Sequence, residues 1–186
     1  MAALTTKSNH TMSDNGNIGP PDKSEAAPYY FLYIDRVTQP DIMSVLERQL
    51  DETLEFANGI PEDRSLHRYA PDKWSIRQVL SHLTDTERVF VYRALWFARG
   101  FDSPLPSFDE KASANAALAD QVSWAQHVNE FRAVRLATLA FFRNLSSDAW
   151  MRRGIASDNP FTVRALAYIA AGHVSHHLSV LNERYM

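Results

Sequence analysis

Apolar residues recur at helical spacing in four segments of this chain, and this pattern limits the fold more than any other feature. In each segment they return every three or four positions, which places them on one face of a helix. No useful length of chain alternates apolar and polar residues as a half-buried strand would. We therefore predict an all-α protein, a four-helix bundle. The predicted helices run from Pro40 to Asn58, from Ser75 to Gly100, from about Val122 to Leu145, and from about Thr162 almost to the C-terminus.

Residues at the ends of these segments support the helix boundaries. Ser75 and Gln78 have the spacing of a capping box, in which each side chain satisfies a backbone N–H group of the first turn. Thr162 is a suitable N-cap for the last helix, and Gly100 ends the second. Residues 101–119 contain two prolines and several small residues, so we expect a long connection with a short helix inside it.

Composition narrows the class of protein. A length of 186 residues suits one domain, and 45% hydrophobic with 22% charged residues is typical of a globular protein. The formal net charge of -3 argues against a nucleic-acid partner, which would favour a basic surplus. The chain has no cysteine, which excludes disulfides, thiolate ligands and a cysteine nucleophile. Any bound metal must therefore use histidine or carboxylate ligands, and any reacting thiol must come from another molecule.

The first 27 residues are polar and rich in Pro, Gly, Ser and Asn, so residues 1–27 are predicted to form a flexible tail. The folded domain is expected to span residues 28–186, beginning with the aromatic group after Pro28. The tail lacks the apolar stretch of a signal peptide, and no segment approaches the length of a membrane span. We expect a cytoplasmic protein with no membrane partner.

Three histidines fall on apolar helix faces. His173 and His177 are four residues apart and share a stripe with leucine and alanine residues, and His82 lies between Val79 and Leu83. Imidazoles buried side by side repel each other when charged and need partners when neutral, and a divalent cation satisfies both conditions. The alternative is that they are surface or core histidines without a ligand. His176 is predicted to face a helix flank or solvent, and His67 and His127 are predicted to lie on the surface.

Two acidic residues follow His82 on the same helix. Asp85 is close enough along the helix surface to accept a hydrogen bond from a metal-bound imidazole or to act as a base near a bound water. The alternative is a solvated carboxylate paired with Arg88 or Arg93. Glu87 faces away from His82 and is predicted to pair with an arginine.

Two stretches resemble motifs of a known family. Residues 69–88, around Lys73-Trp74-Ser75 and His82, are similar to the second-helix motif of the DinB-like superfamily, and residues 171–185 are similar to its last-helix motif. The resemblance implies an up-down-down-up four-helix bundle and a divalent metal, zinc or nickel, held by His82, His173 and His177. It also implies a homodimer. Asp72 departs from the family pattern, where glycine is common, but it concerns a turn rather than the ligands.

Members of this family include transferases and isomerases that use low-molecular-weight thiols, and three histidines leave coordination positions open, as catalytic sites do. The sequence therefore predicts a metal-dependent transferase that joins such a thiol to a small-molecule electrophile. Two alternatives remain. One is a hydrolase that uses metal-bound hydroxide, with Asp85 as its base; the other is a non-catalytic bundle that the metal stabilises. Arg88, Arg93 and Arg99 are candidates for binding an acidic thiol, although charged helix faces are commonly just solvated.

Overall fold

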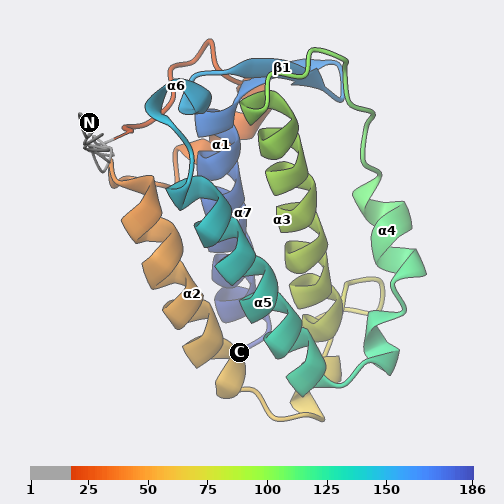
Figure 1. Cartoon of the computed structure of the whole chain (residues 1–186). Helices are drawn as coiled ribbons and strands as arrows, with labels where there is room; N and C mark the ends of the chain where they lie inside the picture. The colour runs from red at the N-terminus through yellow and green to blue at the C-terminus, as the bar shows by residue number, and fades with distance from the viewer. Residues whose placement is uncertain (1–17) are drawn as a thin grey trace, which may run out of the picture.

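The computed structural model describes residues 18–186, so residues 1–17 of the predicted tail lie outside the described part. Four long helices form the bundle: α2 (Ile42–Asn58), α3 (Ile76–Ala98), α5 (Trp124–Arg143) and α7 (Val163–Arg184). Helices α2 and α7 run in one direction, and α3 and α5 run in the opposite direction (Figure 1). Helix α3 packs against α5 and α7, and α2 packs against the same two helices. The predicted up-down-down-up bundle is confirmed.

The shorter elements lie in the connections between the long helices. Helix α4 (Glu110–Ala116) is the short helix expected in the long connection, and it stands outside the bundle beside α3 (Figure 1). The remaining elements are η1 (Pro28–Tyr30), α1 (Phe31–Ile34), η2 (Arg64–Leu66), η3 (Ala119–Gln121), α6 (Ser147–Trp150), β1 (Arg153–Ala156) and β2 (Asn159–Thr162).

The helix ends use the caps that the sequence predicts. Ser75 and Gln78 form the capping box of α3, and the Thr162 side chain accepts a hydrogen bond from the N–H of Ala165 at the start of α7. Gly100 ends α3 with a φ of 80°, a left-handed conformation that glycine adopts at low cost. Helix α2 begins two residues later than the predicted start at Pro40, because the Asp41 side chain caps the helix at Ile42.

Contrary to the all-helical prediction, β1 and β2 form a small antiparallel hairpin at one end of the bundle (Figure 1). Its two-residue loop is Ser157-Asp158, and both residues have positive φ, the requirement of a tight hairpin turn. Leu105 from the long connection bonds to the hairpin through its backbone. Strands of four residues are too short to show the alternation that sequence analysis requires.

The predicted start of the domain at residue 28 is wrong, because the preceding residues are already packed. Glu25 is 1% exposed and accepts hydrogen bonds from the Thr162 hydroxyl at 2.8 Å and from Arg164 Nε at 3.0 Å. This ion pair attaches the N-terminal segment to the first turn of α7. A single carboxylate in a polar segment gives no sequence signal for such burial.

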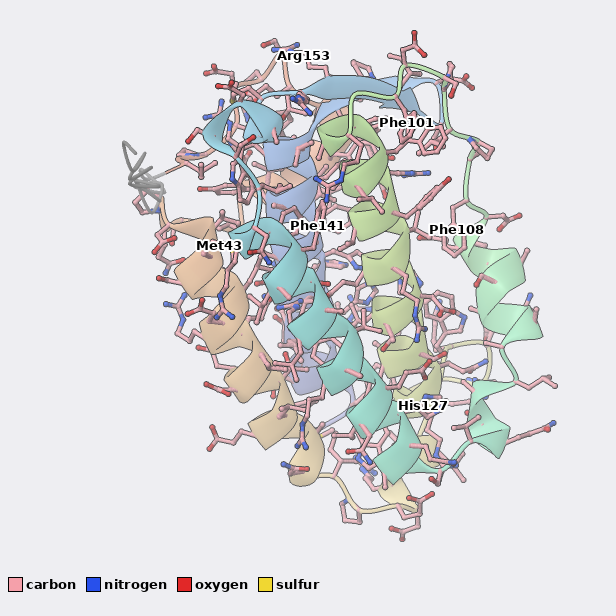
Figure 2. The ribbon with its side chains drawn as sticks, viewed as in Figure 1. Met43, Phe101, Phe108, His127, Phe141 and Arg153 are labelled. Atoms are coloured by element: carbon pink, nitrogen blue, oxygen red, sulfur yellow. The ribbon has the colours of Figure 1, made fainter. Side chains whose placement is uncertain are left out.

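Side chains fill the space between the four long helices (Figure 2). Within the described chain, no helix has both the length and the apolar character of a membrane span. The largest apolar side chains buried almost completely are Tyr168, Phe97, Phe131, Phe142, Phe161, Ile42, Leu46, Ile76, Leu83, Leu166 and Ile169.

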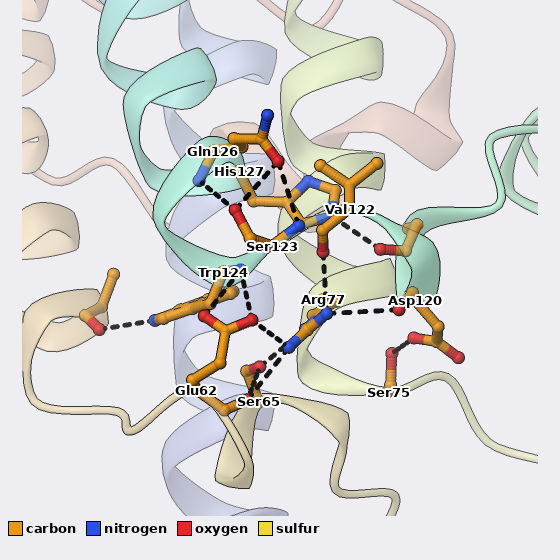
Figure 3. Close-up of polar contacts among 12 residues, drawn as sticks. Glu62, Ser65, Ser75, Arg77, Asp120, Val122, Ser123, Trp124, Gln126 and His127 are labelled. Carbon is orange, nitrogen blue, oxygen red and sulfur yellow. Dashed lines mark hydrogen bonds and ion pairs between the residues drawn. The ribbon is translucent and has the colours of Figure 1, made fainter.

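The prediction that His127 lies on the surface is also wrong. It is 3% exposed, and its Nε2 donates a hydrogen bond to the carbonyl of Ala119 at 2.8 Å. Figure 3 shows it at the start of α5, above a network in which Arg77 bonds to Glu62 and to the carbonyl of Val122. The connection from α4 folds over this end of α5 and covers a histidine whose own helix pattern looked polar.

Candidate metal centre

The structure brings the three predicted histidines together in the interior of the bundle. His82 comes from α3, and His173 and His177 come from successive turns of α7. One ring nitrogen of each lies within 4.8 Å of the others, and the Nε2 atoms of His82 and His173 are 3.2 Å apart. The cluster depends on the contact between α3 and α7, which are far apart in sequence and side by side in the fold.

Burial keeps these imidazoles neutral. Exposed fractions are only 4% for both His82 and His173. Desolvation lowers the pKa of His82 to about 4, and desolvation with the nearby His82 and His176 lowers the pKa of His177 to about 3. Desolvation and the neighbouring histidines also hold the pKa of His173 well below its usual range. Near neutral pH all three rings are therefore in the form that binds metal ions.

Neighbouring side chains fix the orientation of the rings. The Thr86 hydroxyl donates to the backbone carbonyl of His82 at 2.7 Å and lies 3.3 Å from Nδ1 of His173. Because its proton is used on the carbonyl, Thr86 accepts a hydrogen bond from Nδ1–H, which leaves Nε2 of His173 free to face the cluster. The ring of Trp74 packs on His82 with 4.9 Å between ring centroids, and the ring of Tyr33 meets His173 edge-on with 5.1 Å between centroids.

This donor set fits a divalent transition metal. Three neutral imidazoles with converging nitrogens suit ions such as Zn²⁺ and Ni²⁺, whereas Mg²⁺ and Ca²⁺ prefer oxygen ligands. The group contains no carboxylate, and it supplies three ligands where a closed structural zinc site has four.

Asp85 is not part of this cluster. Its carboxylate accepts hydrogen bonds from Arg88 Nη1 at 3.1 Å and from the Ser113 hydroxyl at 3.4 Å, and within residues 18–186 it bonds to no histidine. The structure thus matches the alternative of an arginine-paired carboxylate rather than an acceptor for a ligand imidazole. Glu87 faces away from His82 as predicted and pairs with Arg135.

His176 lies on the flank of α7 rather than in the cluster. Its ring meets Tyr33 of α1 at 5.7 Å, as the prediction of a helix-flank position requires. Its Nδ1 is buried and has no hydrogen-bond partner in the described chain. His176 is therefore a suitable control position for substitutions of His173, because it lies on the same helix but outside the cluster.

Two cavities reach the cluster. The first encloses about 100 Å³ between α3 and the segment of η1 and α1, and His173 is in its wall. The second is about 440 Å³, and His177 lines it together with Trp74, Lys73 and Lys111. Helix α4 contributes residues to both. A metal held by the three histidines would therefore be approachable through two separate openings.

Two further residues of the site lie on the His82 face of α3. Thr86 and Arg93 are four and eleven positions after His82, a spacing that returns to the same helix face. Both are buried beside the first cavity. This spacing is the only sign in the sequence that Thr86 and Arg93 belong to the site. It does not identify them, because threonine and arginine are also common on helix faces that line no site.

Comparison with known proteins agrees with this architecture. The family model of the DinB superfamily matches residues 45–181. Among solved structures, YfiT from Bacillus subtilis, described as a probable metal-dependent hydrolase with an unusual four-helix bundle topology, superposes with a TM-score of 0.68. The alignment covers 79% of this chain and 87% of YfiT at 19% identity, so it establishes the shared fold alone. No curated protein matches the chain. With most of its length matched by the family model, the chain belongs to the DinB superfamily.

Proposed function

We propose that this protein is a metal-dependent enzyme that transfers a low-molecular-weight thiol to a small electrophile, using zinc or nickel held by His82, His173 and His177. The observation that carries the proposal is the histidine cluster itself, in which His82 and His173 are buried, the rings are neutral, and two cavities give access. A divalent ion bound there supplies a Lewis acid that lowers the pKa of a bound thiol or water.

Within residues 18–186 the histidine cluster contains no carboxylate that could serve as its base, and this favours a thiol over water as the nucleophile. A thiol has a pKa near 8.5 and becomes thiolate readily beside a cation, whereas activating water commonly also uses a base. Within residues 18–186, the nearest candidate along the helix, Asp85, is occupied by Arg88 and Ser113. The chain has no cysteine of its own to compete for the metal.

The chain's own residues orient the ligands and limit access by water. Thr86 holds the tautomer of His173 in which Nε2 is free. Trp74 and Tyr33 cover the rings of His82 and His173, so solvent reaches the cluster mainly through the two cavities. Two openings suit a reaction with two substrates, one entering beside His173 and the other beside His177.

Hydrolysis is the second candidate. It is favoured by the description of YfiT as a probable metal-dependent hydrolase, a protein that shares the bundle but only 19% of its aligned residues. In that case one cavity would admit the substrate, and thiol would not be consumed.

Metal content is the first test. Untagged full-length protein should contain zinc or nickel near one equivalent by inductively coupled plasma mass spectrometry. The H173Q variant should lose most of that metal, and the H176Q variant, altered three residues further along α7, should keep it. Absence of metal in the parent after reconstitution with zinc and with nickel would refute the proposal.

Activity separates the two reactions. Metal-loaded parent should consume thiol when supplied with thiols and small electrophiles, and H173Q should not. Ester or amide cleavage without thiol consumption would assign the hydrolase instead. If metal loss lowers the melting temperature sharply and no reaction is found, the ion has only a structural role.

A further inference from the structure

The cavity beside His173 contains a buried arginine without a carboxylate partner. Arg93 projects from α3 and is 5% exposed. Its Nη2 donates to the Ser157 hydroxyl at 2.8 Å and to the carbonyl of Pro106 at 3.4 Å, and both acceptors are uncharged. The Tyr30 hydroxyl is its other polar neighbour. No ion pair within residues 18–186 includes Arg93.

The other buried arginines of the described chain are paired. Arg77, 6% exposed, bonds to Glu62, and Arg135, fully buried, bonds to Glu87 at 2.7 Å. Removing a guanidinium from water without an anion costs free energy, and proteins ordinarily avoid it. A buried arginine in the wall of a cavity therefore has an unfilled requirement for a negative charge, which a ligand in that cavity can meet.

The shape of the cavity limits what that ligand is. Tyr33, Phe90 and Phe108 supply aromatic walls, and Phe108 lies where the connection approaches α4 (Figure 2). The enclosed space of about 100 Å³ suits a small, flat or slender molecule. The fork of an arginine matches a carboxylate, which it holds by two parallel hydrogen bonds.

The two ends of the cavity differ in chemistry. Thr86, which contacts His173, and Arg93 are seven residues apart on α3, or roughly 10 Å along the helix at a rise of 1.5 Å per residue. A ligand that reaches from the arginine toward the histidine thus needs a body of several atoms between its anionic group and its other end. Glu110, exposed at the same cavity, opposes anion binding and disfavours a multiply charged phosphate.

We propose that this cavity binds the carboxylate of a small aromatic or short-chain acid, with Arg93 holding the carboxylate and the far end of the molecule directed toward His173. This inference rests on the proposed function, because it identifies one of the two substrates of that reaction as a carboxylic acid. Arg88 and Arg99, the other arginines considered from sequence, do not meet the condition. Arg88 is paired with Asp85 and Glu130, and Arg99 is exposed.

The test is calorimetric titration of metal-free, full-length protein with benzoate at pH 7.5 and low ionic strength. Without metal, the carboxylate has no ion to bind, so binding reports on the arginine. Benzamide, a neutral molecule of the same shape, should not bind measurably. Arg93→Met should weaken benzoate binding by about tenfold or more, as expected for losing hydrogen bonds to a charged group. Arg88→Met, on the same helix, should change it by less than about twofold.

Absence of benzoate binding in the parent, or equal binding by Arg93→Met, would overturn the inference, and so would tighter binding of inorganic phosphate than of benzoate. If circular dichroism shows that Arg93→Met does not fold, Glu110→Gln provides the second test. It removes a nearby negative charge from the rim and should tighten benzoate binding, whereas unchanged or weaker binding refutes the proposal. Because the protein is metal-free, these results are independent of the metal-content test, and either proposal can fail alone.

Discussion

Glu87 and Arg135 form a two-point ion pair in the centre of the bundle, with Nε to Oε1 at 2.8 Å and Nη2 to Oε2 at 2.7 Å. The pair joins α3 to α5. Arg135 also donates to the side chain of Gln49 on α2, and Gln49 in turn donates to the carbonyl of Ala171 on α7. One continuous polar network thus connects all four long helices. It reaches α7 at Ala171, two residues before His173. This network helps fix the relative position of the helices that carry the histidine cluster.

Breaking this pair on one side should destabilise the fold strongly. Arg135→Met leaves the Glu87 carboxylate buried without a counter-charge, and the expected loss is about 3–5 kcal/mol of unfolding free energy. The double variant E87L/R135M removes both charges and should recover much of that loss. The measurement is urea unfolding of metal-free protein.

The control for that experiment is Arg143→Met, on the same helix α5. Arg143 pairs with Glu47 at 2.7 Å, but both side chains are about half exposed. Solvent screens such a pair, so the expected change is below about 1 kcal/mol. Equal effects at Arg135 and Arg143 would show that burial of the Glu87 pair does not matter to stability.

Thr86 should affect metal affinity without being a ligand. Thr86→Val removes the acceptor for Nδ1–H of His173 while keeping the shape of the side chain, and partners of ligand histidines are typically worth about 10–100-fold in affinity. Thr84→Val is the matched control, since Thr84 is also buried in α3 and bonds to the carbonyl of Leu80 rather than to a histidine. Competition with a chromophoric chelator measures zinc affinity in both. A weaker affinity in both variants alike would exclude a specific role for Thr86.

Sequence analysis could predict the bundle and the histidine cluster because both depend on helical periodicity. His82, His173 and His177 lie on apolar stripes, so forming the helices and burying those stripes is enough to bring the histidines inward. The capping residues Ser75 and Thr162 mark helix starts by local hydrogen bonds, which need no knowledge of the rest of the fold.

The features that sequence analysis missed depend on tertiary contacts. Glu25 is buried because Arg164 happens to lie beside it, and His127 is covered by a connection that folds back over α5. The hairpin is held by Leu105, some fifty residues away in the chain, in addition to its own short ladder. The lack of a carboxylate beside Arg93 is likewise a property of the assembled cavity.

Gly172 permits the close approach of α1 to α7. A Cβ atom there would lie 2.0 Å from the carbonyl oxygen of Tyr33, which is backbone and has little freedom to move. Alanine favours the helix by about 1 kcal/mol, but the overlap should outweigh this and destabilise the protein by about 1–3 kcal/mol. Gly59→Ala is the control, because its Cβ would meet the nearest atom at 3.4 Å and its φ is negative. Urea unfolding compares the two; no loss in Gly172→Ala would show that α1 can move away freely.

Acidification should destabilise the metal-free protein through the buried histidines. The pKa of His82 is about 4 and that of His177 about 3 in the folded state, against 6.5 for an ordinary histidine. As the pH falls below 6.5, the unfolded chain takes up protons that the folded protein does not, so stability decreases. The loss continues until the pH reaches the folded pKa values, near 4 for His82 and near 3 for His177, with a slope of up to about 1.4 kcal/mol per pH unit for each histidine.

The range from pH 7.5 to 5 isolates this effect, because most carboxylates stay ionised there. Urea unfolding at pH 7.5, 6 and 5 should show a steady decrease for the metal-free parent. The variant H82Q/H173Q/H177Q has no imidazole in the cluster and should show a much flatter profile. Zinc should stabilise the parent at both pH 7.5 and pH 5, because the folded histidines stay neutral and able to bind the ion across this range. Parallel profiles for parent and triple variant would mean that the fold does not hold the three histidines neutral, and the cluster would then lack the property that suits it to binding a metal ion.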